Sequence, residues 1–172
     1  MWVFGYGSLM WDGWEVPLHG SRVDGARLKH YRRSFNKSST RNWGTRRHPA
    51  PTLGLEPDEG AECVGSAFEF PEEERGRIER FLIDREGRAF TLPELPVRLP
   101  DGREVNALVP VNDRSGSTYL GNVAPVTRAA MARNAHGSSG NCTEYVRNIH
   151  NRLNSLGIID AAVEEFVRFI GQ

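Results

Sequence analysis

The chain has 172 residues, and its 22 Lys and Arg balance its 22 Asp and Glu, so the formal net charge is zero. This balance gives no electrostatic reason to expect nucleic acid or an anionic membrane as a partner, and a small neutral or zwitterionic ligand fits better. Two cysteines are too few for a disulfide framework, no signal peptide is recognisable and no apolar run approaches the roughly 20 residues that span a bilayer, so we expect a cytoplasmic protein.

The chain begins with an apolar run, residues 1–4, that predicts a strand and opens directly into the turn Gly5-Tyr6-Gly7-Ser8-Leu9. Glycines at these places permit a positive φ or the close approach of a ligand. Successive amides in such a turn can converge on a carboxylate or phosphate. The ordinary alternative is a tight turn that closes a hairpin.

Strands are expected through most of the first two thirds of the chain, with no linker long enough to separate two domains, so residues 1–172 are predicted to form one domain. Mixed basic and aromatic residues at 23–35 indicate a long strand. A polar loop follows at 38–51, and residues 52–55 and 62–70 are predicted to be two further strands.

A helix is predicted to begin at Pro71, because three glutamates follow it and acidic residues are favoured in a first turn. It should run to about Glu86, with Gly87 as its stop. Apolar residues recur within it at helical spacing: Ile78, Phe81 and Leu82.

A hairpin and then three helices are expected in the remainder of the chain. Residues 90–99 and 104–111 are predicted to pair across a Pro-Asp-Gly-Arg turn. The helices are predicted at 124–135, after a cap at Asn141 or Thr143, and after a cap at Asp160.

Glu86 is the first candidate catalytic residue, because it lies at the boundary between the predicted helix and the strand that follows. Apolar neighbours at Phe81, Leu82 and Phe90 would disfavour its charged form and raise its pKa towards the range of a general base. The alternative is that Glu86 is one more solvated acid in a helix rich in them.

Two further possibilities lie in the last third. Residues 140–145 form a polar cluster that could be only a helix cap, and Cys142 could form a thiol centre with His136, six residues away. The five histidines have no metal-ligand spacing, so no metal site is expected.

Five segments in this order resemble the γ-glutamylcyclotransferases, most closely the ChaC-like branch that acts on glutathione: residues 2–9, 32–35, 82–86, 119–121 and 141–145. The resemblance implies an α+β fold, a small mixed β-barrel flanked by helices. It also implies that Glu86 is the catalytic acid and base and that Tyr145 contacts the ligand. The substrate loop would consist of Tyr6, Gly7, Ser8 and Leu9.

The implied reaction is attack of a substrate's α-amine on its γ-glutamyl carbonyl, which forms 5-oxoproline without a metal or cofactor. The chain departs from the ChaC-like pattern at residues 41–44 and 87–90, where the leaving half of the substrate could be recognised. One alternative is therefore a cyclotransferase for γ-glutamylamines or for a γ-glutamyl-protected intermediate. Another is a non-catalytic binding module of the same fold, and nucleic-acid binding by residues 41–48 is a distant third. Oligomeric state is not predicted.

Overall fold

The structure is a computed structural model that describes residues 1–86 and 90–171. The chain forms two compact units: Met1–Arg32 with Pro57–Asp113, and Arg33–Glu56 with Arg114–Gln172. The expectation of a single domain stays a prediction, and each unit is described by itself. No helix in the described parts of the chain is long and apolar enough to cross a membrane.

Nine strands, four α-helices and three 3₁₀ turns make up the described residues. The strands are β1 (Trp2–Gly5), β2 (Ser21–Ser39), β3 (Ala50–Glu69), β4 (Phe90–Thr91), β5 (Glu94–Arg98), β6 (Glu104–Leu108), β7 (Val111–Asn112), β8 (His136–Gly137) and β9 (Gly140–Asn141). The helices are α1 (Arg75–Glu86), α2 (Pro125–Asn134), α3 (Cys142–Ser155) and α4 (Ala161–Ile170), and the 3₁₀ turns are η1 (Ser8–Met10), η2 (Val16–Leu18) and η3 (Glu72–Glu74).

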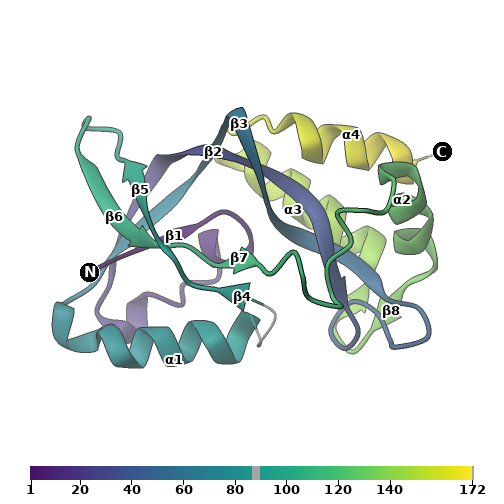
Figure 1. Ribbon diagram of the computed structural model, residues 1–172, viewed down its shortest axis with the longest axis horizontal. Coiled ribbons are helices and arrows are strands. Elements are labelled where there is room, and N and C mark those ends of the chain that lie inside the picture. Colours follow the sequence, from purple (N-terminus) through teal and green to yellow (C-terminus); the bar gives the residue numbers. More distant parts are fainter. Residues whose placement is uncertain (87–89, 172) are drawn as a thin grey trace. The chain divides into compact units, whose positions relative to one another are not determined.

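Five strands form a closed barrel in the order β1-β3-β2-β5-β6 (Figure 1). Within the first unit β1 runs antiparallel to β3, with Val3 opposite Phe68, and parallel to β6, with Val3 opposite Leu108. The barrel is therefore mixed, which confirms the expected α+β architecture. Burial of both faces explains why β1 is a continuous apolar run.

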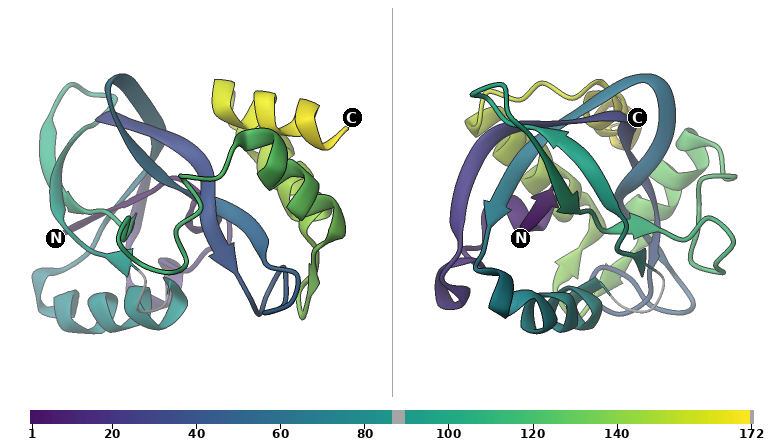
Figure 2. Two further views of the ribbon diagram at one scale, coloured as in Figure 1. Left: turned by 45° about the vertical axis from the view of Figure 1, so that its right-hand side comes forward. Right: turned by 60° about the vertical axis from the view of Figure 1, so that its left-hand side comes forward.

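Helix α1 packs on the barrel of the first unit and lies alongside it in all three views (Figures 1 and 2). Its Ile78 and Leu82 are fully buried in the same cluster as Val3 and Phe68. The predicted helix is confirmed, although its first turn is the separate 3₁₀ turn η3. The predicted stop at Gly87 lies outside the described residues.

One strand expectation was wrong: residues 52–55 and 62–69, expected as two strands, belong to the single 20-residue strand β3, which ends one residue before the expected end at Phe70. The intervening Pro-Asp-Glu-Gly segment stays in the strand because β2 follows it. His30 of β2 has a left-handed φ of 65°, and its ring Nδ1 lies 3.0 Å from the carbonyl oxygen of Glu59. A left-handed residue in a strand is typical of a bulge, which lets paired strands stay in contact past an irregular segment.

The predicted hairpin is confirmed in its central part, where β5 and β6 pair antiparallel from Glu94 opposite Leu108 to Arg98 opposite Glu104. Gly102 takes a φ of 90° in the connecting turn, a conformation that favours glycine. The outer residues of the two expected strands form a separate two-stranded sheet of β4 and β7.

Helices α2, α3 and α4 pack against one another in the second unit, as Figure 2 shows. Asp160 caps α4 as predicted, and it accepts from the amides of Ala162 and Val163 at 3.1 Å each. Asn141 occupies the cap position of α3, but its side chain pairs with His136 at 2.7 Å instead of capping the helix.

Candidate active site

The turn that follows β1 closes as the 3₁₀ turn η1. The amide of Met10 donates to the carbonyl of Gly7 at 2.9 Å. The amides of Ser8 and Leu9 have no hydrogen-bond acceptor within residues 1–86 and 90–171. Orphan amides at the start of a helical turn can bind an anion, and these two donors are therefore available to a ligand.

The glycines of this turn act differently from the expectation. Neither Gly5 nor Gly7 has a positive φ. A Cβ at Gly5 would lie only 3.0 Å from Cβ of Leu9 and 3.0 Å from the ring of Phe68. Glycine at position 5 therefore permits close packing of the turn on the barrel, and a left-handed backbone is not its role.

Two of the predicted substrate-loop side chains are buried. The hydroxyl of Tyr6 donates to the carbonyl of Pro110 at 2.8 Å. Leu9 packs in the apolar core of the first unit. Both side chains anchor the turn, so a ligand here would meet the backbone amides and the Ser8 side chain.

Glu86 ends α1, and its side chain is 19% exposed. Its neighbour Arg85 donates from Nη2 to the Ser8 hydroxyl at 2.8 Å. Nε of the same guanidinium lies 3.9 Å from Oε1 of Glu86. One guanidinium thus links the candidate carboxylate to the candidate substrate turn within the first unit, while the catalytic and binding roles of these residues stay predictions.

The sequence-based reasoning missed Arg85 and Asp12. Arg85 also forms an ion pair with Asp12, which lies just beyond η1. Arg85 lies in the segment 82–86 that resembles the family, where only Glu86 was expected to have a role. Its position directly before the candidate carboxylate was the available signal.

Tyr145, the predicted ligand contact, belongs to the second unit. Its hydroxyl accepts from the amide of Leu53 at 3.1 Å, and its ring centroid lies 4.9 Å from that of Trp43. These contacts hold the ring in place, and its role towards a ligand stays a prediction.

A second polar cluster, also in the second unit, surrounds Glu56, whose side chain is 13% exposed. Tyr119 donates its hydroxyl to Oε1 of Glu56, and Asn36 donates to Oε2 at 2.6 Å. Burial and then the bond to Glu56 raise the pKa of Tyr119 above its usual value. The Tyr-Leu-Gly segment at 119–121 was recognised in the sequence without a role, and this cluster gives its tyrosine a structural one.

The structure argues against the possible thiol centre at Cys142. Cys142 is fully buried, its thiol donates to the carbonyl of Pro51 at 3.4 Å, and burial raises its pKa to about 12. His136 is exposed and pairs with Asn141. A thiol that stays protonated at neutral pH is a poor nucleophile.

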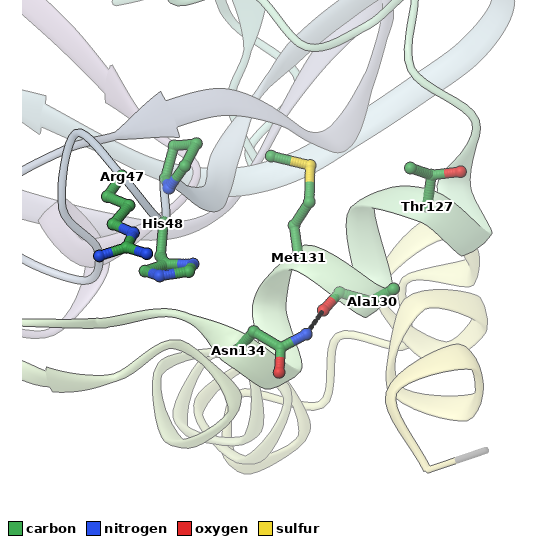
Figure 3. Close-up of a pocket in the computed structure, with 7 residues that line it drawn as sticks. Arg47, His48, Thr127, Ala130, Met131 and Asn134 are labelled. Carbon is green, nitrogen blue, oxygen red and sulfur yellow. Dashed lines mark hydrogen bonds between the residues drawn. The ribbon is translucent and has the colours of Figure 1, made fainter.

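A pocket of about 320 Å³ opens on the second unit between the loop before β3 and helix α2. Figure 3 shows Arg47 and His48 on one side and Met131 and Asn134 on the other, with Asn134 donating to the Ala130 carbonyl. No carboxylate and none of the predicted site residues line it. It therefore lacks the acid and base that the implied reaction needs.

No group of three or more His, Cys, Asp or Glu side chains in the described residues could hold a metal ion. The expected independence from metals and cofactors rests on the chemistry of the reaction and stays a prediction.

The fold is similar to that of a protein of known structure. The crystal structure of a γ-glutamylcyclotransferase specific to glutathione, from yeast, superposes with a TM-score of 0.84 over 99% of this chain and 95% of that one, at 20% identity. At this identity the likeness defines the fold alone. The chain thus has the γ-glutamylcyclotransferase fold.

All of residues 1–172 match the family described as ChaC-like protein, and the chain belongs to that family. A relative from Escherichia coli (strain K12), named glutathione-specific γ-glutamylcyclotransferase, is 30% identical over 97% of this chain and 71% of its own length. Arabidopsis thaliana γ-glutamylcyclotransferase 2-3 is 29% identical over 96% of this chain and 85% of its own. The chain is accordingly an enzyme of the γ-glutamylcyclotransferase type.

Proposed function

We propose that this enzyme converts glutathione to 5-oxoproline and cysteinylglycine, with Glu86 as its acid and base. The relative from Escherichia coli carries the substrate in its name. The observation that carries the catalytic assignment is the single guanidinium of Arg85, which contacts both Ser8 of the turn and Glu86.

The chemistry needs one carboxylate. The substrate's α-amine attacks the γ-carbonyl carbon, a new C–N bond closes the five-membered lactam, and the old amide C–N bond breaks. Since a free α-amine has a pKa of about 8, a base must take a proton before or during attack. Glu86 accepts that proton and returns it to the leaving nitrogen, so one group serves both steps.

The turn supplies orientation and charge stabilisation. Its amides at Gly7, Ser8 and Leu9 bind either the α-carboxylate of the substrate or the developing oxyanion. Holding the γ-glutamyl chain curled for attack is an entropic gain that reaches roughly 7–11 kcal/mol in well-oriented intramolecular reactions. Tyr145 is proposed as a further ligand contact.

The test is an assay in water enriched in ¹⁸O. Intramolecular attack consumes no water, so 5-oxoproline should appear in equal amount to cysteinylglycine and carry no ¹⁸O. Labelled glutamate in place of 5-oxoproline would identify a hydrolase and end the proposal. Binding of glutathione without any product would favour the non-catalytic module instead.

A second candidate substrate is a γ-glutamyl compound with a larger or anionic leaving half, such as a γ-glutamylamine derivative or a γ-glutamyl-protected intermediate. Residues 41–44, where the chain departs from the family pattern, lie in the loop before β3, and Arg47 and His48 of the same loop line a pocket without an acidic residue. A panel of γ-glutamyl donors with neutral, cationic and anionic leaving halves distinguishes the two. Glutathione giving the highest kcat/KM supports the first candidate, and a higher value for another donor supports the second.

We also propose that the enzyme works in the cytoplasm on a small-molecule substrate, without nucleic acid or membrane partners. Both cysteines are buried thiols, which suits a reducing compartment. The net charge of zero supports a small zwitterionic ligand.

A further inference from the structure

Arg85 contacts three other side chains, and its own side chain is 25% exposed. Nη2 donates to the Ser8 hydroxyl at 2.8 Å and also pairs with Asp12. Nε faces Glu86 at 3.9 Å. Three segments of the first unit, namely the turn, the residues just beyond η1 and the end of α1, therefore meet at one side chain.

The guanidinium of Arg85 also lies against an aromatic ring. Its Cζ lies 5.9 Å from the ring centroid of Phe81, one helical turn earlier. Phe81 in turn stacks on Trp14, with centroids 5.1 Å apart and ring planes 4° from parallel. An arginine over an aromatic face is favoured electrostatically, and the stacked pair limits the positions that the guanidinium can take.

The direction of the bond to Ser8 has a chemical consequence. A guanidinium has only donors, so the Ser8 oxygen must accept in this bond. The hydroxyl hydrogen of Ser8 is then left to donate, and it has no acceptor within residues 1–86 and 90–171. Ser8 thus offers a hydroxyl donor beside the unpaired amides of Ser8 and Leu9.

We propose that Arg85 is a positioning residue that fixes the Ser8 hydroxyl as a donor to an acceptor oxygen of the bound γ-glutamyl group. Asp12 orients the guanidinium for this task. The inference rests on the proposed function, because it assumes that the turn binds a γ-glutamyl group, and it adds two residues to which the reaction had assigned no part.

A double-mutant cycle between Arg85 and Ser8 tests the proposal. Ser8→Ala should lower kcat/KM about tenfold, the worth of one hydrogen bond of roughly 1.4 kcal/mol. Arg85→Lys keeps the charge, but its ammonium ends one bond short of the Nη2 position that contacts Ser8 and Asp12, and it should cost about five- to tenfold when Ser8 is present. In the Ser8→Ala background the same change should cost less than twofold, because residues that act through one another are not additive.

Asp12→Asn should have the same effect as Arg85→Lys: kcat/KM should fall only when Ser8 is present. Arg80→Gln is the matched control, because Arg80 is an exposed residue of α1 without a hydrogen bond or ion pair in the described chain. It should leave kcat/KM unchanged. Thermal melting of every variant separates loss of positioning from loss of the fold.

Equal costs of Arg85→Lys with and without Ser8 would overturn the inference, since a merely structural role is additive. To keep this result apart from a failure of the proposed function, the cycle is repeated on glutathione binding by calorimetry in the Glu86→Gln background. If Arg85 and Ser8 are coupled in the binding constants for glutathione but the wild type forms no product, the proposed reaction is rejected and the positioning role is kept. Absence of coupling in both measurements would reject the positioning role.

Discussion

Arg85 donates to the hydroxyl of Ser8 at 2.8 Å, although the two residues lie 77 positions apart in the chain. The residue that follows Arg85 is Glu86, the candidate catalytic carboxylate. The proposed reaction uses a base at Glu86 and a substrate-binding turn at Ser8, and this hydrogen bond connects the end of α1 to the turn after β1.

Gly65→Ala should destabilise the barrel by about 1–3 kcal/mol or more. A Cβ at position 65 would lie 2.3 Å from the carbonyl oxygen of Gly5 and 2.7 Å from the ring of Phe4, so β1, which leads into the candidate substrate turn, would have to move. Urea unfolding measures the change. Gly76→Ala in α1 is the control, because its Cβ meets nothing closer than 3.7 Å. It should be neutral or stabilising by up to about 1 kcal/mol, and a similar loss in both variants would contradict the packing argument.

Tyr119→Phe should make the free energy of unfolding fall less steeply with pH in the alkaline range. The raised pKa of Tyr119 means that the folded protein keeps the phenol proton to higher pH than the unfolded chain. This contribution to the free energy of unfolding is present below about pH 10 and lost as the pH rises through the raised pKa. Unfolding curves from about pH 8 to 11.5 should therefore fall more steeply for the wild type than for Tyr119→Phe. Tyr31→Phe is the control, because Tyr31 is a partly exposed tyrosine whose hydroxyl makes no hydrogen bond in the described chain, and a fall as steep for Tyr119→Phe as for Tyr31→Phe would contradict the prediction.

Cys142 should resist alkylation in the native protein. With a pKa raised to about 12 by burial, roughly one thiol in ten thousand is ionised at pH 8. Iodoacetamide should leave activity intact, and mass spectrometry should find Cys142 labelled only after unfolding. Cys142→Ala should keep kcat within about twofold. Rapid inactivation with label at Cys142 alone would restore the thiol centre that the structure argues against.

Local signals in the sequence predicted most of the helices and the first strand. The helix that ends at Glu86, the Asp160 cap and the apolar spacing of Ile78 and Leu82 depend on neighbours within a few residues, and they are confirmed, although α1 begins at Arg75 and only the 3₁₀ turn η3 follows Pro71 directly. The continuous strand β3 was missed because its Pro-Asp-Glu-Gly segment is typical of a turn. Only pairing with β2, which no local pattern reveals, keeps that segment extended.

Candidate residues of the site could be predicted from the sequence, but the hydrogen bonds between them could not. Glu86 and the turn at Ser8 stand out in the sequence, whereas the bonds from Arg85 to Ser8 and from Tyr119 to Glu56 span 77 and 63 residues. Bonds over such distances depend on how the barrel and the helices bring the chain together. The thiol centre failed for a related reason, since the burial that raises the pKa of Cys142 comes from residues far away in the sequence.

The most direct measurement of the central claim is the rate of 5-oxoproline formation from glutathione by Glu86→Gln, beside Asp84→Asn as control. Asp84 is an exposed acid of the same helical turn without a partner in the described chain, so its amide variant should keep the wild-type rate. Glu86→Gln keeps the size of the side chain and removes the base, and the account predicts a fall in kcat of at least about 100-fold with the melting temperature unchanged. A folded Glu86→Gln protein that forms 5-oxoproline at close to the wild-type rate would contradict the account.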